Sequence, residues 1–184
     1  MPTRRPTAPD ARPTRLRLAE LAILALLIVI FIGFVIDKVW ELRAAAERLA
    51  VIRTVNAIRS SLGTEAMQRA IAGETASLAS LHHGNPMTLV DDKPPGYLGR
   101  LNKPDPAQIP GYQWYFDTDR KVLVYRVANS DHFASSLAGV PRIRFQLQAS
   151  YRDRNGNGRF DRGVEGLEGL NLVGLEDYHW KMRE

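Results

Sequence analysis

One apolar segment near the N-terminus sets the strongest constraint on how this chain can fold. From Leu21 to Ile36 no side chain is charged or polar, and Leu18, Ala19 and the single acid Glu20 precede this run. A hydrocarbon core about 30 Å thick requires about 20 helical residues, because a helix rises about 1.5 Å per residue. The run reaches the lower end of that range. It therefore predicts a transmembrane helix over residues 18–39.

The charge of the chain is concentrated ahead of this segment. Five arginines oppose Asp10 alone in residues 1–17, which leaves +4 there, and the formal charge of the whole chain is +5. The other residues together carry only +1, so the chain has no basic domain and we expect no nucleic-acid partner. Four prolines in the same tail predict a disordered cytoplasmic segment over residues 1–17.

The asymmetry of charge also predicts the orientation of the membrane helix. Arginine and lysine collect on the cytoplasmic side, whereas the residues that follow the apolar run carry no net charge. We expect a single-pass protein of a bacterial inner membrane, with its N-terminus in the cytoplasm and its C-terminal domain in the periplasm. A cleaved secretory signal is the alternative, but the A-x-A-like site nearest to the run, Ala44–Ala46, lies beyond the run and inside a helical pattern.

A helical pattern continues past the membrane segment. Apolar residues recur at steps of three and four, with charged residues between them and no Gly or Pro before Gly63: Val35, Val39, Leu42, Ala46, Leu49, Ile52, Val55, Ile58 and Leu62. We therefore expect one helix from the membrane to about residue 62. Thr64 is a candidate N-cap for one or two short helices that end before Gly84, which makes residues 40–84 a periplasmic helical stem.

The last part of the chain is typical of a small sheet. Residues 85–111 are rich in Pro and Gly and predict mostly loop, whereas YQWYF and KVLVYRV flank a four-residue hairpin loop, Asp117–Arg120. RIRFQLQASYR alternates strictly between apolar and polar side chains, and LNLVG and YHWKM supply the last strands. We predict an α+β domain over residues 85–184, in which the stem helix packs on a small antiparallel sheet.

The start of the apolar segment resembles the N-terminal segment of type IV pilins and type II secretion pseudopilins. The shared feature is Leu18-x-Glu20 opening an apolar helix that continues as an amphipathic stem. In that family a Glu near the start of the mature chain contacts the N-terminal amine of the neighbouring subunit. In the matching register Leu16 would begin the mature chain, and Arg15 replaces the Gly or Ala that precedes the cleavage point. Glu20 thus either registers neighbouring membrane helices or is balanced by Arg17 one turn earlier.

A second resemblance lies in the succession GNPMTLV, PPGYLG and PGYQWYFDTDRKVLVYRV. It is similar to pilin-like proteins of type IV pilus and type II secretion clusters, in particular accessory proteins of MSHA-type (mannose-sensitive haemagglutinin) pilus biogenesis, and it covers most of residues 18–184. The resemblance implies a pilin-like fold and a non-catalytic membrane component that binds other pilin-like or pilus and secretion assembly proteins. The alternatives are a processed minor pilin or pseudopilin, and an unrelated membrane-tethered calcium- or ligand-sensing module.

The segment DRNGNGRFDRGVE has the spacing of an EF-hand-type calcium loop up to its ninth position. In an EF-hand loop the twelfth position carries a bidentate acid, but here it is Val164, and the nearest acid, Glu165, comes one residue later. Four nearby arginines also oppose cation binding. Two consecutive Asn-Gly pairs equally predict a hairpin turn. Calcium is thus the only cofactor that the sequence suggests, with a polar turn as the alternative; its ligands would be Asp153, Asn155, Asn157, Arg159, Asp161 and Glu165.

Patterns typical of enzymes are missing from the sequence. The chain has no Cys, its four His lack metal-ligand spacing, and no nucleotide-binding glycine pattern is present. We therefore expect no catalytic residue and no small-molecule substrate. The pair His82-His83 follows a predicted helix end and is interpreted as a cap. A set of aromatic residues forms either an interface or sugar-binding surface, or cross-strand core pairs: Trp114, Tyr115, Tyr125 and Trp180.

Overall fold

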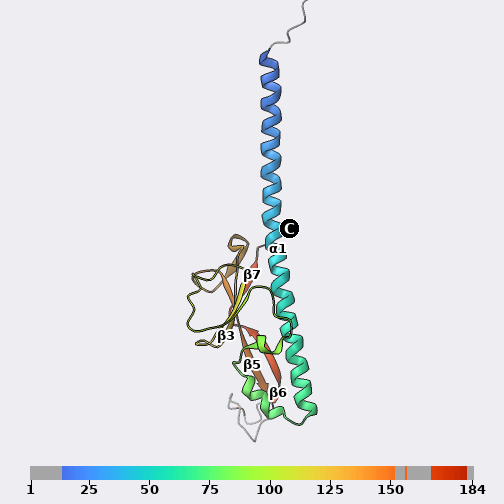
Figure 1. Ribbon diagram of the computed structural model, residues 1–184, viewed down its shortest axis with the longest axis vertical. Helices are drawn as coiled ribbons and strands as arrows, with labels where there is room; N and C mark the ends of the chain where they lie inside the picture. Colours follow the sequence, from blue (N-terminus) through green and yellow to red (C-terminus); the bar gives the residue numbers. More distant parts are fainter. Residues whose placement is uncertain (1–13, 152–155, 157–166, 182–184) are drawn as a thin grey trace, which may run out of the picture. The chain divides into compact units, whose positions relative to one another are not determined.

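The computed structural model describes residues 14–151, 156 and 167–181 of the chain. The chain divides into two compact units, Met1–Leu42 and Arg43–Glu184. Helix α1 (Thr14–Ile71) forms the described part of the first unit and is also the first element of the second (Figure 1). All the strands among the described residues belong to the second unit, which gives an α+β layout as predicted.

Helix α1 is longer than the sequence predicts. It passes through Gly63 and ends after Ile71, where Gly73 adopts a φ of +73°. The predicted cap residue Thr64 instead lies inside the helix, and its hydroxyl donates to the Ser60 carbonyl oxygen (3.1 Å). The prediction that the helix ends at Gly63 was wrong because one glycine costs a helix only about 1 kcal/mol, while the fully buried Leu62 holds this turn in the core.

The strands of the second unit form two sheets. One has five strands in the order β1-β2-β3-β5-β6, and the other pairs β4 with β7. In chain order the elements after α1 are η1 (Thr75–Leu81), η2 (Pro86–Leu89), β1 (Tyr97–Leu101), β2 (Gln113–Asp117), β3 (Val122–Arg126), η3 (Ser130–His132), β4 (Phe133–Ser135), β5 (Arg142–Tyr151), β6 (Leu167–Gly174) and β7 (Tyr178–Trp180). The hairpin predicted around residues 117–120 is confirmed, since β2 and β3 pair antiparallel.

The five-stranded sheet is mixed rather than purely antiparallel. Strand β1 lies in the segment predicted as loop and pairs parallel with β2, and the other pairs are antiparallel. Both the amide and the hydroxyl of Thr118 donate to the Leu101 carbonyl oxygen (2.9 and 3.1 Å), which fastens the end of β1. The sequence does not reveal this strand because it is a short edge strand with a glycine, Gly99, at its centre.

The main core lies between α1 and one face of the five-stranded sheet. Ile143, Phe145 and Leu147 of β5 are buried, as their alternation predicts, and belong to one apolar cluster with α1. This confirms that the helix covers the apolar face of the sheet. The helix contributes Val51, Val55, Ile58 and Leu62 to the cluster.

The opposite face of the sheet carries a smaller cluster. Tyr115, Val122 and Val124 are buried there with Ile109 from the segment between β1 and β2, and Leu101 packs against them. Successive residues of a strand point to opposite faces, so β2 and β3 are buried on both sides. This second face also bears polar side chains, among them Asp117, Arg142 and Arg144.

Candidate functional site

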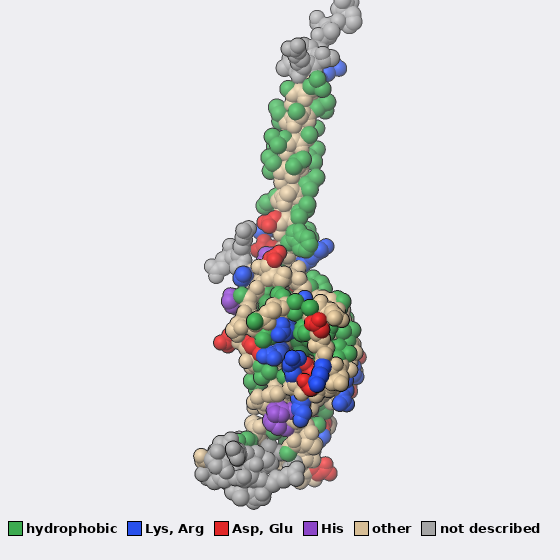
Figure 2. Space-filling model, turned by 90° about the vertical axis from the view of Figure 1, so that its left-hand side faces the viewer, with side chains coloured by type: hydrophobic (Ala, Val, Ile, Leu, Met, Phe, Trp, Pro, Cys, Tyr) green, Lys and Arg blue, Asp and Glu red, His purple; other side chains and the backbone are tan. Residues whose placement is uncertain are grey.

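The described part of the first unit is an exposed apolar helix. An 18-residue window within it has a mean hydropathy of 3.0, and none of that window is buried. Hydrophobic side chains cover the visible face of this unit (Figure 2). By length and composition the helix is able to cross a membrane. The identity of that membrane and the orientation of the chain stay predictions.

Glu20 and Arg17 both occupy exposed positions of α1. Within the described part of the chain no ion pair joins the two side chains. The predicted pairing of Glu20 with Arg17 is therefore not formed in this structure. Its role in registering membrane helices stays a prediction.

The best-defined polar cluster of the second unit surrounds Glu47 of α1, whose side chain the sequence analysis did not single out. Glu47 is only 3% exposed. Its Oε1 accepts hydrogen bonds from the Tyr125 hydroxyl (2.9 Å) and the Ala128 amide (2.8 Å). Its Oε2 accepts from the amide (3.0 Å) and the Nδ2 (2.6 Å) of Asn129. Because these donors follow or belong to β3, Glu47 fastens α1 to that end of the sheet.

The same contacts govern the protonation of Tyr125. Burial, and after it the charge of Glu47 and the hydrogen bond between the two, raises the pKa of Tyr125 far above its ordinary value of 10.0. The phenol therefore stays protonated and donates to the carboxylate. Both carboxylate oxygens of Glu47 accept hydrogen bonds from groups at the end of β3, as expected of a structural anchor.

The position of Glu47 also corrects the predicted apolar stripe of α1. The buried face runs through Ala44, Glu47, Val51, Val55, Ile58 and Leu62. Of the predicted stripe, Leu42, Ala46, Leu49 and Ile52 are instead exposed. The helix is apolar on two faces in this part, so periodicity alone cannot tell which face is buried. The signal that could have found Glu47 is its spacing of three and four residues from Ala44 and Val51.

The proposed calcium ligands lie outside the described residues. Asp153, Asn155, Asn157, Arg159, Asp161 and Glu165 all fall between β5 and β6. These two strands pair antiparallel, from Phe145 with Gly174 to Tyr151 with Leu167. Both predictions for the segment, calcium loop and polar turn, therefore stand untested. Among the residues that the structure describes, no group of three or more acidic or histidine side chains is arranged to hold a metal ion.

His82 and His83 lie at the end of η1 and cover part of an edge of β5. Their rings are stacked with centroids 3.7 Å apart. The His83 amide donates to the Leu147 carbonyl oxygen (2.8 Å), and the Ala149 amide donates to His82 Nδ1 (3.1 Å). Strand β3 pairs only with residues 142–145 of β5. The histidine pair thus satisfies backbone groups beyond the end of β3, and protects the strand edge there.

Three of the four singled-out aromatic residues are buried within the chain. Trp114, Tyr115 and Tyr125 are 3%, 1% and 3% exposed. Trp114 and Tyr125 are cross-strand partners, with ring centroids 4.7 Å apart. Trp180 is half-buried against Phe133, its partner in the second sheet (5.2 Å between centroids). These contacts are those of core and cross-strand pairs.

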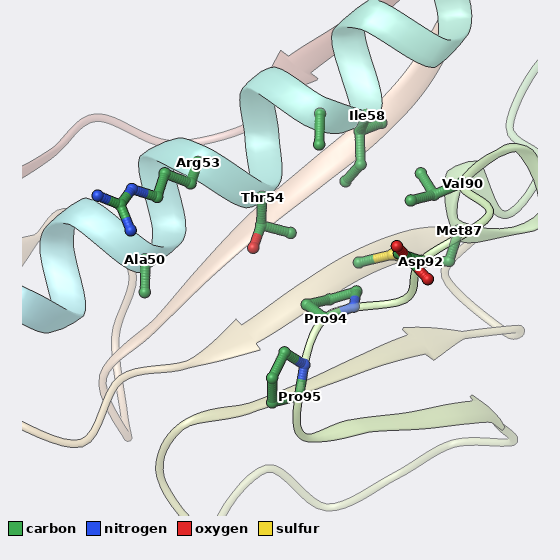
Figure 3. A pocket seen from close by; sticks show the side chains of 10 residues that line it. Ala50, Arg53, Thr54, Ile58, Met87, Val90, Asp92, Pro94 and Pro95 are labelled. Carbon is green, nitrogen blue, oxygen red and sulfur yellow. The ribbon is translucent and has the colours of Figure 1, made fainter.

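An open groove of about 320 Å³ lies between α1 and the segment of residues 87–95 (Figure 3). Small side chains of the helix form one wall, and Met87, Val90 and two prolines form the other. Arg53 and Asp92 add opposite charges to this mainly apolar lining. Apart from these two, no lining side chain carries a charge.

No protein-family model matches this chain, and neither a curated protein nor a solved structure is significantly similar to it.

Proposed function

We propose that this chain is a non-catalytic, single-pass inner-membrane component of a type IV pilus assembly of the MSHA type or of a type II secretion machine. One observation carries the proposal: the helix that is able to cross a membrane is also the spine of the core of the second unit. Burial begins at Ala44, inside the A-x-A-like site that lies nearest to the apolar run. Cleavage there would cut into the core, which favours a retained anchor.

The exposed face of α1 supports an assembly role. On the side of the helix away from the sheet, Ala46 and Leu49 are exposed, and Leu49 retains 53% of its surface. Further along the same side the residues become polar, at Arg53, Asn56 and Ser60. An exposed apolar helix face is typical of helix–helix association. We propose that this face packs on the helix of another membrane-anchored assembly protein.

A second candidate is a processed minor pilin or pseudopilin that enters the filament. The exposed position of Glu20 on α1 favours it, since an exposed carboxylate is accessible to the amine of a neighbouring subunit. The intact mass of the protein extracted from its native membrane separates the two. Retention of Met1 or Pro2 supports the fixed accessory, and a chain that begins near Leu16 supports the filament subunit.

Photo-crosslinking in the native membrane tests the assembly role. A photoreactive amino acid at Leu49 samples the apolar face, and the same residue at Ser60, three turns further on the same side, is the matched control. We expect Leu49 to yield a crosslink to a pilin-like protein or to another pilus or secretion component, identified by mass spectrometry. Equal products from the two positions, or no crosslinked protein at Leu49, would contradict the proposal.

A further inference from the structure

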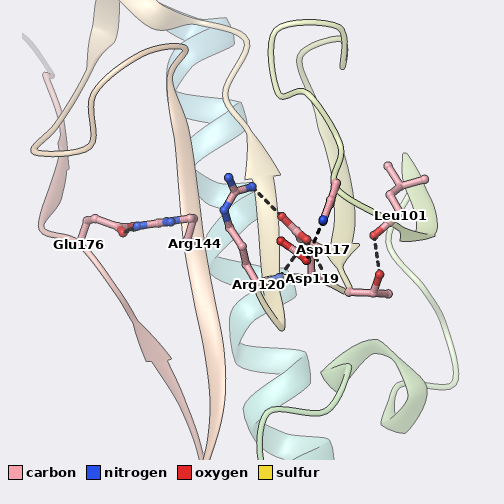
Figure 4. Close-up of polar contacts among 8 residues, drawn as sticks. Leu101, Asp117, Asp119, Arg120, Arg144 and Glu176 are labelled. Atoms are coloured by element: carbon pink, nitrogen blue, oxygen red, sulfur yellow. Dashed lines mark hydrogen bonds and ion pairs between the residues drawn. The ribbon is translucent and has the colours of Figure 1, made fainter.

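A small polar cavity lies on the face of the five-stranded sheet opposite α1. It has a volume of about 150 Å³, and its walls include the side chains of Tyr115, Asp117, Arg120, Arg142 and Arg144. Figure 4 shows this face, with α1 behind the strands. Lys and Arg side chains gather on the side of the second unit that faces the viewer in Figure 2. Three arginines among the lining residues make the walls of the cavity basic.

The positive charges around the cavity exceed the negative ones. Arg120 pairs with Asp117 (Nη1 to Oδ2, 3.0 Å), and Arg144 pairs with Glu176 (Nε to Oε1, 2.8 Å) (Figure 4). The Nη1 of Arg142 donates only to the carbonyl oxygens of residues 138 and 140 (3.2 and 2.9 Å). Within the described residues Arg142 has no carboxylate partner. Arg142 is therefore not directly paired, and the nearest carboxylate acting on it, Glu176, is already paired with Arg144.

Arg142 is also partly removed from water. Burial lowers its pKa; the neighbouring cations Arg144 and Arg120 act in the same direction, and Tyr115 and Glu176 act against them. A guanidinium stays charged in proteins, so burying that of Arg142 costs the folded chain solvation free energy. A bound anion would offset this free energy.

The hydroxyl of Tyr115 adds a neutral donor to the same cavity. Tyr115 is 1% exposed, lines the cavity, and makes no hydrogen bond within the described part of the chain. Burial raises its pKa, so the phenol keeps its proton. The hydroxyl therefore keeps its hydrogen as a donor that a group bound in the cavity can accept.

We infer that this cavity binds a small oxyanion, a carboxylate or phosphate group, through Arg142, Arg144 and the Tyr115 hydroxyl. Guanidinium groups recognise such anions through paired N–H donors, and a protonated phenol adds one more hydrogen-bond donor. Pockets for drug-sized ligands measure about 300–1,000 Å³, so this cavity admits only a small group. That group is either a free anion or the acidic side chain of another protein, which present the same chemistry.

Thermal unfolding of the full chain in detergent micelles, followed by tryptophan fluorescence, tests this inference. Sodium phosphate, sodium acetate and a capped Gly-Glu-Gly peptide each replace sodium chloride at constant ionic strength. The variants are R142Q and Y115F, and R48Q is the control because it removes one charge from an exposed position of α1. Phosphate also stabilises proteins non-specifically, and the rise in Tm of the cavity variants measures this non-specific effect.

We expect at least one probe to raise the Tm of the wild type and R48Q in a saturable way. R142Q should lose about tenfold or more of the affinity, because it removes a charge-assisted hydrogen bond. Y115F should bind several-fold more weakly, yet unfold within about 2 °C of the wild type without anion, because its hydroxyl has no protein partner. Response to phosphate or acetate indicates a free anion, and response to the peptide alone indicates an acidic side chain of a partner. Absence of a saturable shift at tens of millimolar of every probe, or identical responses from all variants, overturns the inference.

Discussion

Glu47 is a charged residue inside an apolar core, and its four hydrogen bonds explain why it is tolerated there. Replacing it by Leu leaves the amides of Ala128 and Asn129 and the Tyr125 hydroxyl without an acceptor. We predict that E47L lowers the free energy of unfolding by about 3 kcal/mol or more, since each buried unsatisfied donor costs about 1–3 kcal/mol. Urea unfolding of the full chain in detergent measures the loss.

Two matched variants show whether the loss comes from the hydrogen bonds. Y125F removes one donor and leaves the carboxylate three others, so we expect a loss of about 1 kcal/mol. R48Q changes the adjacent exposed residue and should stay within about 0.5 kcal/mol of the wild type. If E47L were no less stable than R48Q, Glu47 would not be the anchor of α1 on the sheet.

Tyr125 predicts how stability depends on alkaline pH. Its pKa in the folded chain is raised above the ordinary 10.0, so the folded chain holds the proton more tightly than the unfolded chain. The resulting stability is fully present below about pH 10 and is lost as the pH rises toward the folded pKa. We predict a fall in the free energy of unfolding above pH 10 that is shallower in Y125F. Burial also raises the pKa of Tyr115 and Tyr178, so the slope of Y125F should decrease rather than vanish; equal slopes would contradict this account.

At the scale of elements, the continuity of α1 through Gly63 offers a simple test. A Cβ at Gly63 would meet no atom within 4 Å. Alanine loses less backbone entropy than glycine in a helix, so we predict that G63A raises the free energy of unfolding by about 0.5–1 kcal/mol. The control is G111A, because a Cβ there would approach the Ala128 Cβ to 2.5 Å and should destabilise the chain. A destabilising G63A would mean that this turn is not helical.

The elements also show what sequence reasoning can and cannot reach. The alternation in β5 predicts its buried face correctly because one side of the strand is apolar and the other polar. The same reasoning fails in α1, where Leu49 and Val51 are equally apolar but only Val51 is buried. It misses β1 because an edge strand is defined by its partner β2, not by its own pattern.

The two polar sites were missed for a related reason. Glu47 meets its donors from residues 125–129, and the cavity of Arg142 and Tyr115 joins side chains from different strands. Such clusters arise from tertiary packing, so no local spacing of residues in the sequence predicts them. The sequence did mark Tyr115 and Tyr125 as notable, although not for the contacts that they make.

At the scale of the whole molecule, the predicted topology can be tested directly because the chain has no cysteine. Single cysteines at Thr7, Leu27 and Ser136 sample the basic tail, the apolar run and an exposed position of the second unit. In cells with a permeabilised outer membrane, we expect a membrane-impermeant maleimide to label S136C directly. T7C should be labelled only after lysis of the inner membrane, and L27C only after denaturation. The reason is the cytoplasmic preference of the five arginines in the tail. Their replacement by glutamate should therefore increase labelling at position 7 in intact cells, and labelling of T7C but not S136C in the unaltered chain would reverse the proposed orientation.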